Sequence, residues 1–496
     1  MQYTVSELER KTRKKSIVCF GAGNNLTYVF HAISDLQLEK RVKYIVDNDE
    51  TKWGTQRNIN GKSLEIKCPK EILKEKRNDI LLVITIINYI SIMEQIESLV
   101  ADLTGLEVTL SPLFRNSYDK YFDRLFKKLP MKKTIILQGE GDTCENAVAL
   151  AKYMRSQTAY KDVKLGWLCN HPDKFKKTKS DTYILRDLPS KKHSIMEAIR
   201  YFNLINRSYM YIYENKMLPK ARKEQISCYM NHGTPIKSTK GKITVYPDTD
   251  FVLSSSTNIN GIFIEQYKAL EEQIVICGSP RTDVLYNDDI HQELAKYLKI
   301  SQYRKIVLWA PTFRTMIGNS RSDSTMKFTY GVPLIESDED ILELMELLRK
   351  EKILLIIKPH LYQELSELLL KENENIKIIK QNMLDDLNAN VYDLMKLTDC
   401  MITDYSSIAF DYLILDRPLG YTLDDIEQYT IGFAVDNPLE YMPGRHLKSV
   451  KDMCLFLMET CDGKDLFYKE RRQLRKYMLQ YDDGKSSERL LNILGI

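Results

Sequence analysis

Two histidines lie in short loops that each follow an apolar run, where an imidazole could act on a bound ligand. His232 comes after the run 226–230, and His360 ends a Lys-Pro-His motif after the run 353–357. An imidazole titrates near neutral pH and can take a proton from a hydroxyl group. His232 is therefore a candidate general base, although a turn with a hydrogen-bonded histidine would give the same local pattern.

Basic side chains occupy similar places after apolar runs. They are Lys237, Arg281, Arg314 and Lys358, with Thr312 two residues before Arg314. Ligands of open α/β sheets bind at the carboxyl ends of the strands, which is where these side chains are expected. Arg281 has two interpretations that the sequence leaves open, a phosphate ligand or a structural ion-pair partner. Asp283, after Gly278-Ser279-Pro280, is expected to cap the next helix.

The segment 400–411 combines hydroxyl groups with carboxylates. A strand is predicted to end at Thr403, and Ser406 and Ser407 stand where a helix N-cap is expected. Free backbone N–H groups at such a position favour an anion. Asp404 and Asp411 oppose an anion, so at least one of them should be paired or should orient a neighbour.

The strands and helices that carry these residues alternate along the sequence. This alternation predicts parallel sheets. We expect an accessory Rossmann-like domain at 1–111, a basic amphipathic linker at 112–133 and two lobes at 134–298 and 299–496. Five motifs at strand ends of the two lobes then form a cationic cleft for a phosphorylated ligand. No acidic cluster has metal-ligand spacing, so the protein itself is expected to neutralise the phosphate charge, without a metal.

Composition excludes several classes of protein. The 496 residues include 72 Lys and Arg against 68 Asp and Glu, a net charge of +4 that does not indicate a nucleic-acid binder. The cysteines form no C-x-x-C pair and the N-terminus lacks a secretory pattern, so we expect a reducing cytoplasm. The longest apolar stretch, 80–93, is too short to span a bilayer.

Residues 113–133 are basic and aromatic, which fits either a solvated interdomain helix or a surface that contacts anionic lipid.

The first domain carries a possible nucleotide site. Gly21 and Gly23 follow a strand, and Asp47 ends the next strand. In a dinucleotide site such glycines let the backbone approach a pyrophosphate and the acidic residue binds a ribose. Leu26 replaces the third glycine of that pattern, so a docking or structural role stays open. The run 46–55 resembles an accessory domain attached to bacterial surface-polysaccharide enzymes.

In chain order, the motifs of residues 130–496 resemble those of the CDP-glycerol glycerophosphotransferase family, which builds teichoic acids and related polymers. The motifs are His-Gly-Thr-Pro-x-Lys, Gly-x-Pro-Arg-x-Asp, Ala-Pro-Thr-x-Arg, Lys-Pro-His and Thr-Asp-Tyr-Ser-Ser, with a weaker match at 483–489 that includes Arg489. Asn231 is a departure, because the family often has a large aromatic residue there. The loop 316–340 is longer than usual.

The resemblance implies a GT-B-like pair of Rossmann-type lobes, with CDP-glycerol or CDP-ribitol in the C-terminal lobe. It also implies that an acceptor hydroxyl attacks the β-phosphorus and releases CMP, with His232 as base. His360, Arg314 and the Ser406–Ser407 segment would stabilise the leaving group, and Arg489 would reach the donor. The implied acceptor is a lipid-linked or oligomeric polyol phosphate or saccharide, which the basic segment 113–133 would approach at the inner face of the cell membrane.

Three alternatives remain. A GT-B glycosyltransferase would share the fold but would use a nucleotide-sugar. A non-catalytic nucleotide-binding scaffold of a surface-polymer complex would keep the lobes without the reaction. The first domain could be a separate NAD-dependent enzyme. The sequence leaves open which polyol is carried and whether the enzyme adds one unit or polymerises.

Overall fold

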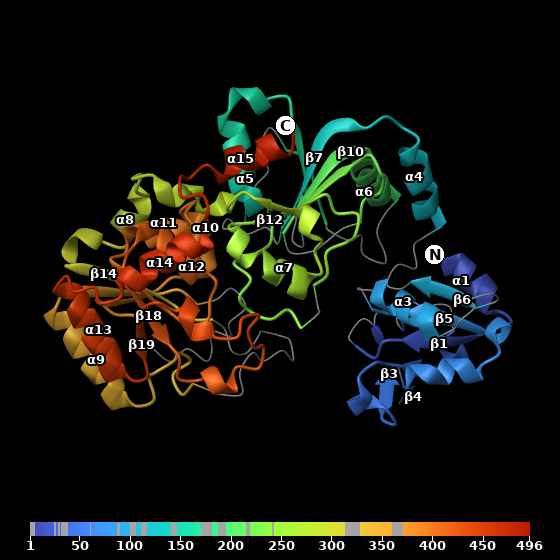
Figure 1. Ribbon diagram of the computed structural model, residues 1–496, viewed down its shortest axis with the longest axis horizontal. Coiled ribbons are helices and arrows are strands. Elements are labelled where there is room, and N and C mark those ends of the chain that lie inside the picture. The colour runs from blue at the N-terminus through green and yellow to red at the C-terminus, as the bar shows by residue number, and fades with distance from the viewer. Residues whose placement is uncertain are drawn as a thin grey trace. The chain divides into compact units, whose positions relative to one another are not determined.

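The structure is a computed structural model. It describes all residues except 1–4, 24–25, 28–29, 31–37, 60, 87–89, 100–105, 111–116, 140–145, 170–180, 187–194, 215–218, 241–242, 313–327 and 360–370. The chain divides into two compact units. Unit 1 comprises Met1–Lys132 and Leu188–Ser208, and unit 2 comprises Lys133–Asp187 and Tyr209–Ile496. We describe each unit by itself (Figure 1).

Unit 1 contains a six-stranded sheet with the order β3-β4-β2-β1-β5-β6. The strands are β1 (Ser16–Phe20), β2 (Val42–Val46), β3 (Gln56–Ile59), β4 (Lys62–Lys67), β5 (Ile80–Ile84) and β6 (Glu107–Leu110). All pairs are parallel except β3–β4. Successive residues of β1 point to opposite faces, with Ile17 and Cys19 in one apolar cluster and Val18 and Phe20 in another. Burial on both faces explains why β1 and β5 are continuous apolar runs.

Helices complete unit 1. Among the described residues they are α1 (Val5–Thr12), α3 (Ile90–Leu99), α4 (Ser117–Lys127) and α6 (Ile195–Arg207). The segment expected to be a basic helix or linker therefore contains a helix. Asn206 of α6 donates to the carboxylate of Asp123 on α4 at 3.1 Å, which joins these two helices. Among the helices of the described residues, none is both long and apolar enough to span a bilayer.

The first sheet of unit 2 has seven strands in the order β13-β12-β11-β10-β7-β8-β9. The strands are β7 (Lys132–Gln138), β8 (Lys164–Cys169), β9 (Asp181–Arg186), β10 (Ser208–Tyr213), β11 (Ile226–Tyr229), β12 (Phe251–Ser254) and β13 (Ile274–Ile276). Helices α5 (Asn146–Ser156), α7 (Asn260–Tyr267) and α8 (Gln292–Tyr297) accompany this part of the chain. We call this sheet with its helices the first lobe.

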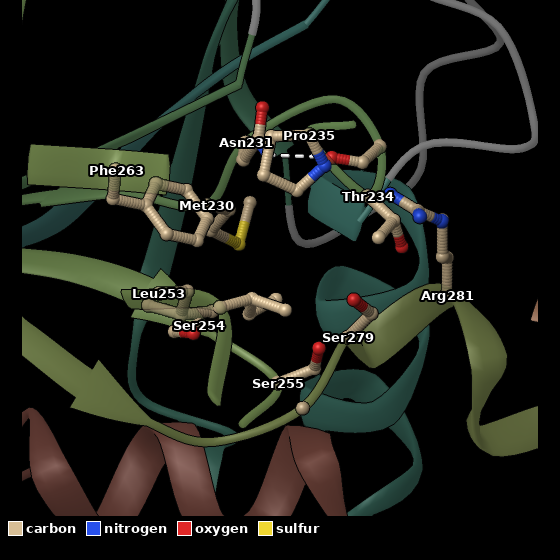
Figure 2. Close-up of a pocket in the computed structure, with 13 residues that line it drawn as sticks. Met230, Asn231, Thr234, Pro235, Leu253, Ser254, Ser255, Phe263, Ser279 and Arg281 are labelled. Atoms are coloured by element: carbon tan, nitrogen blue, oxygen red, sulfur yellow. Dashed lines mark hydrogen bonds between the residues drawn. The ribbon is translucent and has the colours of Figure 1, made fainter. Parts of the chain in front are cut away.

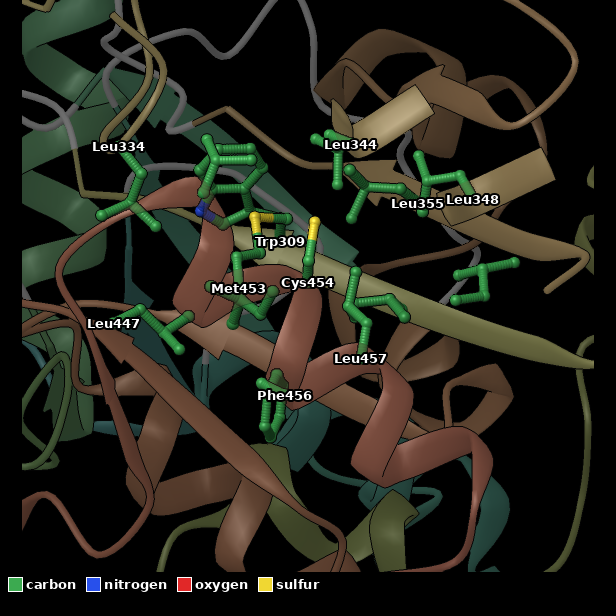
Figure 3. Close-up of a cluster of buried hydrophobic side chains, with 14 of the residues drawn as sticks. Trp309, Leu334, Leu344, Leu348, Leu355, Leu447, Met453, Cys454, Phe456 and Leu457 are labelled. Carbon is green, nitrogen blue, oxygen red and sulfur yellow. The ribbon is translucent and has the colours of Figure 1, made fainter. Parts of the chain in front are cut away.

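The second lobe of unit 2 has a six-stranded parallel sheet in the order β16-β15-β14-β17-β18-β19. Its strands are β14 (Lys305–Ala310), β15 (Ile353–Ile357), β16 (Ile376–Ile378), β17 (Cys400–Thr403), β18 (Leu419–Thr422) and β19 (Arg445–Leu447). Its helices are α9 (Asp338–Lys350), α10 (Gln381–Asp386), α11 (Val391–Leu397), α12 (Ile408–Tyr412), α13 (Val450–Cys461) and α14 (Tyr468–Met478). Figure 3 shows α13 contributing Met453 and Leu457 to the apolar cluster around Trp309 of β14.

The last helix, α15 (Ser486–Ile493), returns to the first lobe. Leu490, Leu491 and Leu494 are buried in the same apolar cluster as residues of β7 and α5, and Figure 1 shows α15 beside α5. The boundary expected at residue 299 separates the strands of the two sheets, but this helix crosses it. The apolar face of α15, spaced at helical intervals, is what places the end of the chain there.

Candidate active site

His232 lies in the loop after β11, and the side chain of Asn231 fixes the backbone at this point. Asn231 has a φ of +60°, its Oδ1 accepts a hydrogen bond from His232 N at 2.8 Å, and its Nδ2 donates to Gly233 O at 2.5 Å. Asparagine adopts the left-handed conformation more readily than most residues, because its short polar side chain bonds locally. The loop therefore holds His232 exposed at the surface of the lobe.

Two buried polar residues, Asn146 and Glu214, form hydrogen bonds that hold this loop in place. Asn146, at the start of α5, donates from Nδ2 to Asn231 O at 3.0 Å and accepts from Arg281 N at 3.1 Å. Glu214 accepts from Asn146 N at 2.7 Å and from Ala147 N at 3.1 Å, so a carboxylate occupies the positive end of α5. Sequence reasoning missed Asn146 and Glu214, since neither belongs to a recognisable motif.

Arg281 forms a buried ion pair that joins the two lobes. Its Nε donates to Asp411 Oδ2 at 3.0 Å and its Nη2 donates to Asp411 Oδ1 at 3.2 Å. Its Nη1 donates to His232 O at 3.1 Å, and Tyr392 donates to Asp411 Oδ2 at 2.8 Å. Of the two interpretations of Arg281, these contacts favour the structural ion pair. They also satisfy the expectation that Asp404 or Asp411 would be paired.

The electrostatic environment keeps Arg281 charged. Arg281 and Asp411 are 7% and 6% exposed. Burial disfavours the guanidinium cation, but the carboxylate of Asp411 outweighs that effect and raises the pKa of Arg281 above its ordinary value. The positive charge of Arg281 is therefore directed to the carboxylate of Asp411 and to the carbonyl oxygen of His232, and not to a ligand.

The loop of His232 and the segment before α12 are in close contact. A Cβ atom added to Gly233 would lie 2.6 Å from Ser407 Oγ and 3.1 Å from Ser407 Cβ, closer than real Cβ atoms approach. Only glycine fits there without displacing the serine. The loop that carries the candidate base in the first lobe and Ser407 in the second lobe are therefore neighbours.

Ser406 and Ser407 carry hydroxyl groups that the helix does not use. Ser407 precedes α12, but its side chain makes no capping bond, so the expected cap by a serine hydroxyl is wrong for this residue. Ser406 and Ser407 contribute carbonyl groups to the first turn, accepting from Ala409 N and Phe410 N. Within the described part of the chain, neither hydroxyl has a hydrogen-bond partner.

Thr403 and Asp404 lie at the switch point of the second sheet, between β14 and β17, where ligands of such sheets bind. Thr403 is fully buried and donates to Ala310 O at 2.7 Å. Asp404 is also buried and accepts from Thr312 N at 2.9 Å and from the Thr312 hydroxyl. These hydrogen bonds connect the end of β17 to the end of β14, so Thr403 and Asp404 fix the backbone on which the candidate site lies.

Lys237 lies in the segment between β11 and β12, and Lys358 directly follows β15. The backbone of Lys237 forms an isolated antiparallel β-bridge with Phe433 of the second lobe. The ammonium group of Lys237 lies 5.5 Å from the ring centroid of Tyr429. Tyr429 in turn packs against Tyr405, with ring centroids 4.4 Å apart. Lys358 follows β15 and donates to Pro359 O at 3.2 Å. Lys237 thus reaches the aromatic residues next to Ser406.

Two residues near the end of the first lobe have other contacts than expected. Asp283 does not cap the next helix in sequence; it accepts from Ser486 N at 2.9 Å and Ser487 N at 2.8 Å, at the start of α15. Burial raises the pKa of Asp283. Arg489 donates to Cys277 O and to Asp483 Oδ2, and its guanidinium lies 3.7 Å from the ring centroid of Tyr481. These contacts favour a structural role for Arg489.

The possible nucleotide site of unit 1 has its carboxylate engaged. Asp47 Oδ2 accepts from Ala22 N at 2.6 Å, between Gly21 and Gly23, and its Oδ1 accepts from Asp49 N at 2.9 Å. A Cβ atom on Gly21 would lie 2.5 Å from Ile86. The glycine turn is therefore packed against the end of β5, and Asp47 stabilises the turn. Nucleotide binding by this unit stays a prediction.

Two expected site residues, Arg314 and His360, lie outside the described residues. Among the residues that are described, no group of three or more His, Cys, Asp and Glu side chains is placed to hold a metal ion. The expectation that no metal takes part also stays a prediction.

The fold and the site together define a GT-B-like α/β protein. The structure of the wall teichoic acid polymerase TagF is similar to this chain, with a TM-score of 0.58 at 21% identity over 76% of this chain and 93% of TagF. A variant of TagF from a crystal soaked with CDPG gives the same TM-score at 20% identity over 76% of this chain and 92% of TagF. The predicted pair of Rossmann-type lobes is confirmed.

The chain belongs to the CDP-glycerol:poly(glycerophosphate) glycerophosphotransferase family, whose model matches residues 121–495. It is 29% identical to a teichoic acid ribitol-phosphate polymerase of Staphylococcus aureus over 50% of this chain and 45% of that protein. It is 27% identical to a teichoic acid glycerol-phosphate primase of Bacillus subtilis over 56% of this chain and 65% of that protein. The chain therefore spans less than two thirds of these relatives.

Proposed function

We propose that this chain transfers a polyol phosphate from a CDP-activated polyol to a hydroxyl group of an acceptor, in the synthesis of a teichoic-acid-like or capsular polymer. The donor is CDP-glycerol, with CDP-ribitol as the alternative. The observation that carries the proposal is the close approach of Gly233 to Ser407, which brings the loop of His232 next to a hydroxyl group that has no partner among the described residues. Family membership supports the choice of donor.

The proposed reaction is a displacement at the β-phosphorus. His232 takes the proton of the acceptor hydroxyl as the new bond from oxygen to phosphorus forms. The bond from the β-phosphorus to the bridging oxygen breaks, and CMP leaves with that oxygen. Negative charge grows on the leaving phosphate, where Ser406, Ser407, Arg314, His360 and the basic residues Lys237 and Lys358 are proposed to act. Since these side chains supply the donors, the proposal includes no metal cofactor.

The experiment that tests this function is a donor panel. The purified chain is incubated with CDP-glycerol, CDP-ribitol and UDP-sugars in the presence of an oligomeric polyol-phosphate acceptor, and the released nucleotide and product size are measured. Release of CMP together with acceptor extension is expected. Release of UDP from a UDP-sugar without CMP would replace the proposal by a glycosyltransferase. Binding without release of either nucleotide would favour a scaffold.

The hydroxyls of Ser406 and Ser407 are proposed to bind the donor pyrophosphate. The double variant Ser406→Ala, Ser407→Ala keeps the Cβ atom that packs against Gly233 and removes only the hydroxyls. Hydrogen bonds to charged groups contribute about 1.5–3 kcal/mol each, so the donor Kd is expected to rise at least about tenfold. Calorimetry with CDP-glycerol measures it, and Ser301→Ala, an exposed serine of the second lobe, is the control. An unchanged Kd in the double variant would contradict the assignment.

We also propose that unit 1 contacts the inner face of the cell membrane, where a lipid-linked acceptor would lie. Tyr121 and Leu125 of α4 are 62% and 38% exposed, next to the basic side chains of Arg124 and Lys127. Exposed apolar groups beside basic ones suit an anionic lipid surface.

Co-sedimentation with vesicles tests this contact. The chain is expected to bind vesicles that contain anionic lipid, to bind less at high salt, and to lose binding when Tyr121 and Leu125 are both replaced by serine. Leu73→Ser is the matched control, because Leu73 is 53% exposed in the same unit but lies outside α4. Equal loss in this control, or equal binding to neutral vesicles, would contradict the proposal.

A further inference from the structure

A short segment of the second lobe, residues 425–434, pairs with the first lobe directly after the loop of His232. We call this segment the strap. Hydrogen bonds cross between the lobes here, and they run from Ala434 N to Ile236 O at 2.8 Å, from Ser238 N to Gly432 O at 3.1 Å, and from the ammonium group of Lys240 to Thr430 O. The two lobes are therefore joined at this place by paired stretches of backbone, as neighbouring strands of a sheet are.

Buried side chains fasten the strap to Tyr405, the residue before Ser406. Tyr405 and Asp425 are both buried, and the tyrosine hydroxyl donates to the aspartate carboxylate. The ring centroid of Tyr405 lies 4.4 Å from that of Tyr429 and 5.8 Å from that of Phe433. Aromatic pairs at these distances, and a hydrogen bond to a buried carboxylate, each favour one arrangement. A shift of the strap would therefore disturb the backbone that carries Ser406.

The loop of His232 is held closely within its own lobe. The cavity beside this loop has a volume of about 20 Å³, room for about one water molecule. Figure 2 shows Met230, Leu253 and Phe263 packed at this cavity, and Arg281 reaching toward the loop. The guanidinium of Arg281 donates to His232 O at 3.1 Å. Close packing leaves the loop little freedom to move relative to the first lobe.

Other contacts join the same two lobes away from the strap. Ser255 O accepts from Gln480 N at 2.8 Å, and the hydroxyl of Ser255 donates to Met478 O at 2.8 Å. Arg281 and Asp411 form the buried ion pair described above. Enzymes with two lobes commonly close around a ligand by rotation at a hinge. A rotation at any one of these contacts would stretch the others, so the lobes are held in one arrangement.

We infer that the strap is a positioning element, which fixes the distance between the lobes so that the transfer site is assembled before the donor binds. This inference rests on the proposed function, in which His232 and Lys237 act from the first lobe on a phosphate bound by the serines of 406–407 in the second lobe. Groups on separate lobes need a fixed distance, because a misplacement of about 1 Å can cost about 10²-fold in rate.

Two variants loosen the strap without changing a residue that is proposed to touch the donor. Ala434→Pro removes the N–H group that donates to Ile236 O, and Lys240→Met removes the ammonium group that donates to Thr430 O. In both variants kcat for CMP release should fall by up to about 10²-fold. Kd for CDP-glycerol, measured by calorimetry, should stay at the wild-type value. Ala434→Ser keeps the N–H group and is the matched control, with normal kcat.

Spin labels test the strap without turnover. Glu265→Cys on α7 and Glu343→Cys on α9 place one label at an exposed position of each lobe. Cys68 and Cys144 are replaced by serine in all samples, and the other described cysteines are buried. Double electron–electron resonance then measures the distance between the lobes. The wild type should give one narrow distance that CDP-glycerol leaves unchanged, and both strap variants should give a broader distribution.

The two measurements separate this inference from the proposed function. If the wild type releases no CMP, the proposed function fails, but a broader distance distribution in the variants still supports the strap. A distribution that is unchanged in both variants would overturn the inference, whatever their kcat. A wild-type distance that shortens when CDP-glycerol binds would also overturn it, because the lobes would then close on the donor. So would a loss of activity that a rise in donor Kd explains.

Discussion

The His232→Ala variant is expected to fold, to bind CDP-glycerol with a Kd near that of the wild type, and to lose transfer. Loss of a general base typically lowers the rate about 10²–10⁴-fold, so we expect kcat to fall by about 10²–10⁴. The fold should survive because the described bonds that hold the loop come from the side chains of Asn231, Asn146 and Arg281 and reach backbone atoms. These bonds remain when the imidazole is removed.

The measurement is CMP release under saturating donor, with Kd for the donor measured on the same preparation. His446→Ala is a matched control, because His446 is also exposed but lies on β19, and its ring contacts Met442 O. The control should turn over normally. Normal turnover by a folded His232→Ala protein would remove His232 from the mechanism, whereas a large rise in donor Kd would make it a binding residue.

The Asp411→Ala variant is expected to be strongly destabilised. It leaves the guanidinium of Arg281 buried without its carboxylate partner, and removing one partner of a buried ion pair costs about 3–5 kcal/mol. In a chain of 496 residues that unfolds as one unit, 1 kcal/mol corresponds to about 1 °C, so the thermal midpoint is expected to fall by about 3–5 °C. Thermal unfolding of the purified variant measures the change.

Two further variants make the interpretation sharp. Glu351→Ala breaks the ion pair with Arg304, whose side chains are 24% and 49% exposed, and exposed pairs contribute at most about 1 kcal/mol. Replacing both partners by apolar residues, Arg281→Met with Asp411→Leu, should recover much of the stability because no charge is left unpaired. It should not recover transfer, since the bond from Arg281 to His232 O is lost. A midpoint within a degree of the wild type for Asp411→Ala would contradict the structural role of the pair.

The sequence was informative where local pattern decides structure. β1, β2, β14, β15 and β17 lie where continuous apolar runs predicted strands, because parallel strands buried on both faces leave little room for polar residues. The position of each loop at the carboxyl end of its own sheet also followed from the sequence, but the contact between the His232 loop and Ser407 joins two different sheets and needed the structure.

Contacts between distant segments could not be predicted in this way. Asn146, Glu214 and Tyr392 are buried polar residues that support the site, and each bonds to a residue at least nineteen positions away. Nothing in the neighbouring sequence marks such a partner. The same reason explains Asp283, which was expected to cap the next helix and instead caps α15, more than two hundred residues further along the chain.

The path of α15 has a consequence for how the molecule is made. The first lobe is built mainly from residues up to about 298, but its apolar cluster also needs Leu490, Leu491 and Leu494, which are synthesised after the whole second lobe. During translation, the apolar cluster of the first lobe therefore stays partly uncovered until α15 has been synthesised and has packed against it. The second lobe can close its own cluster earlier, because the members of that cluster come from residues 307–461. We expect the lobe that is encoded second to finish folding first.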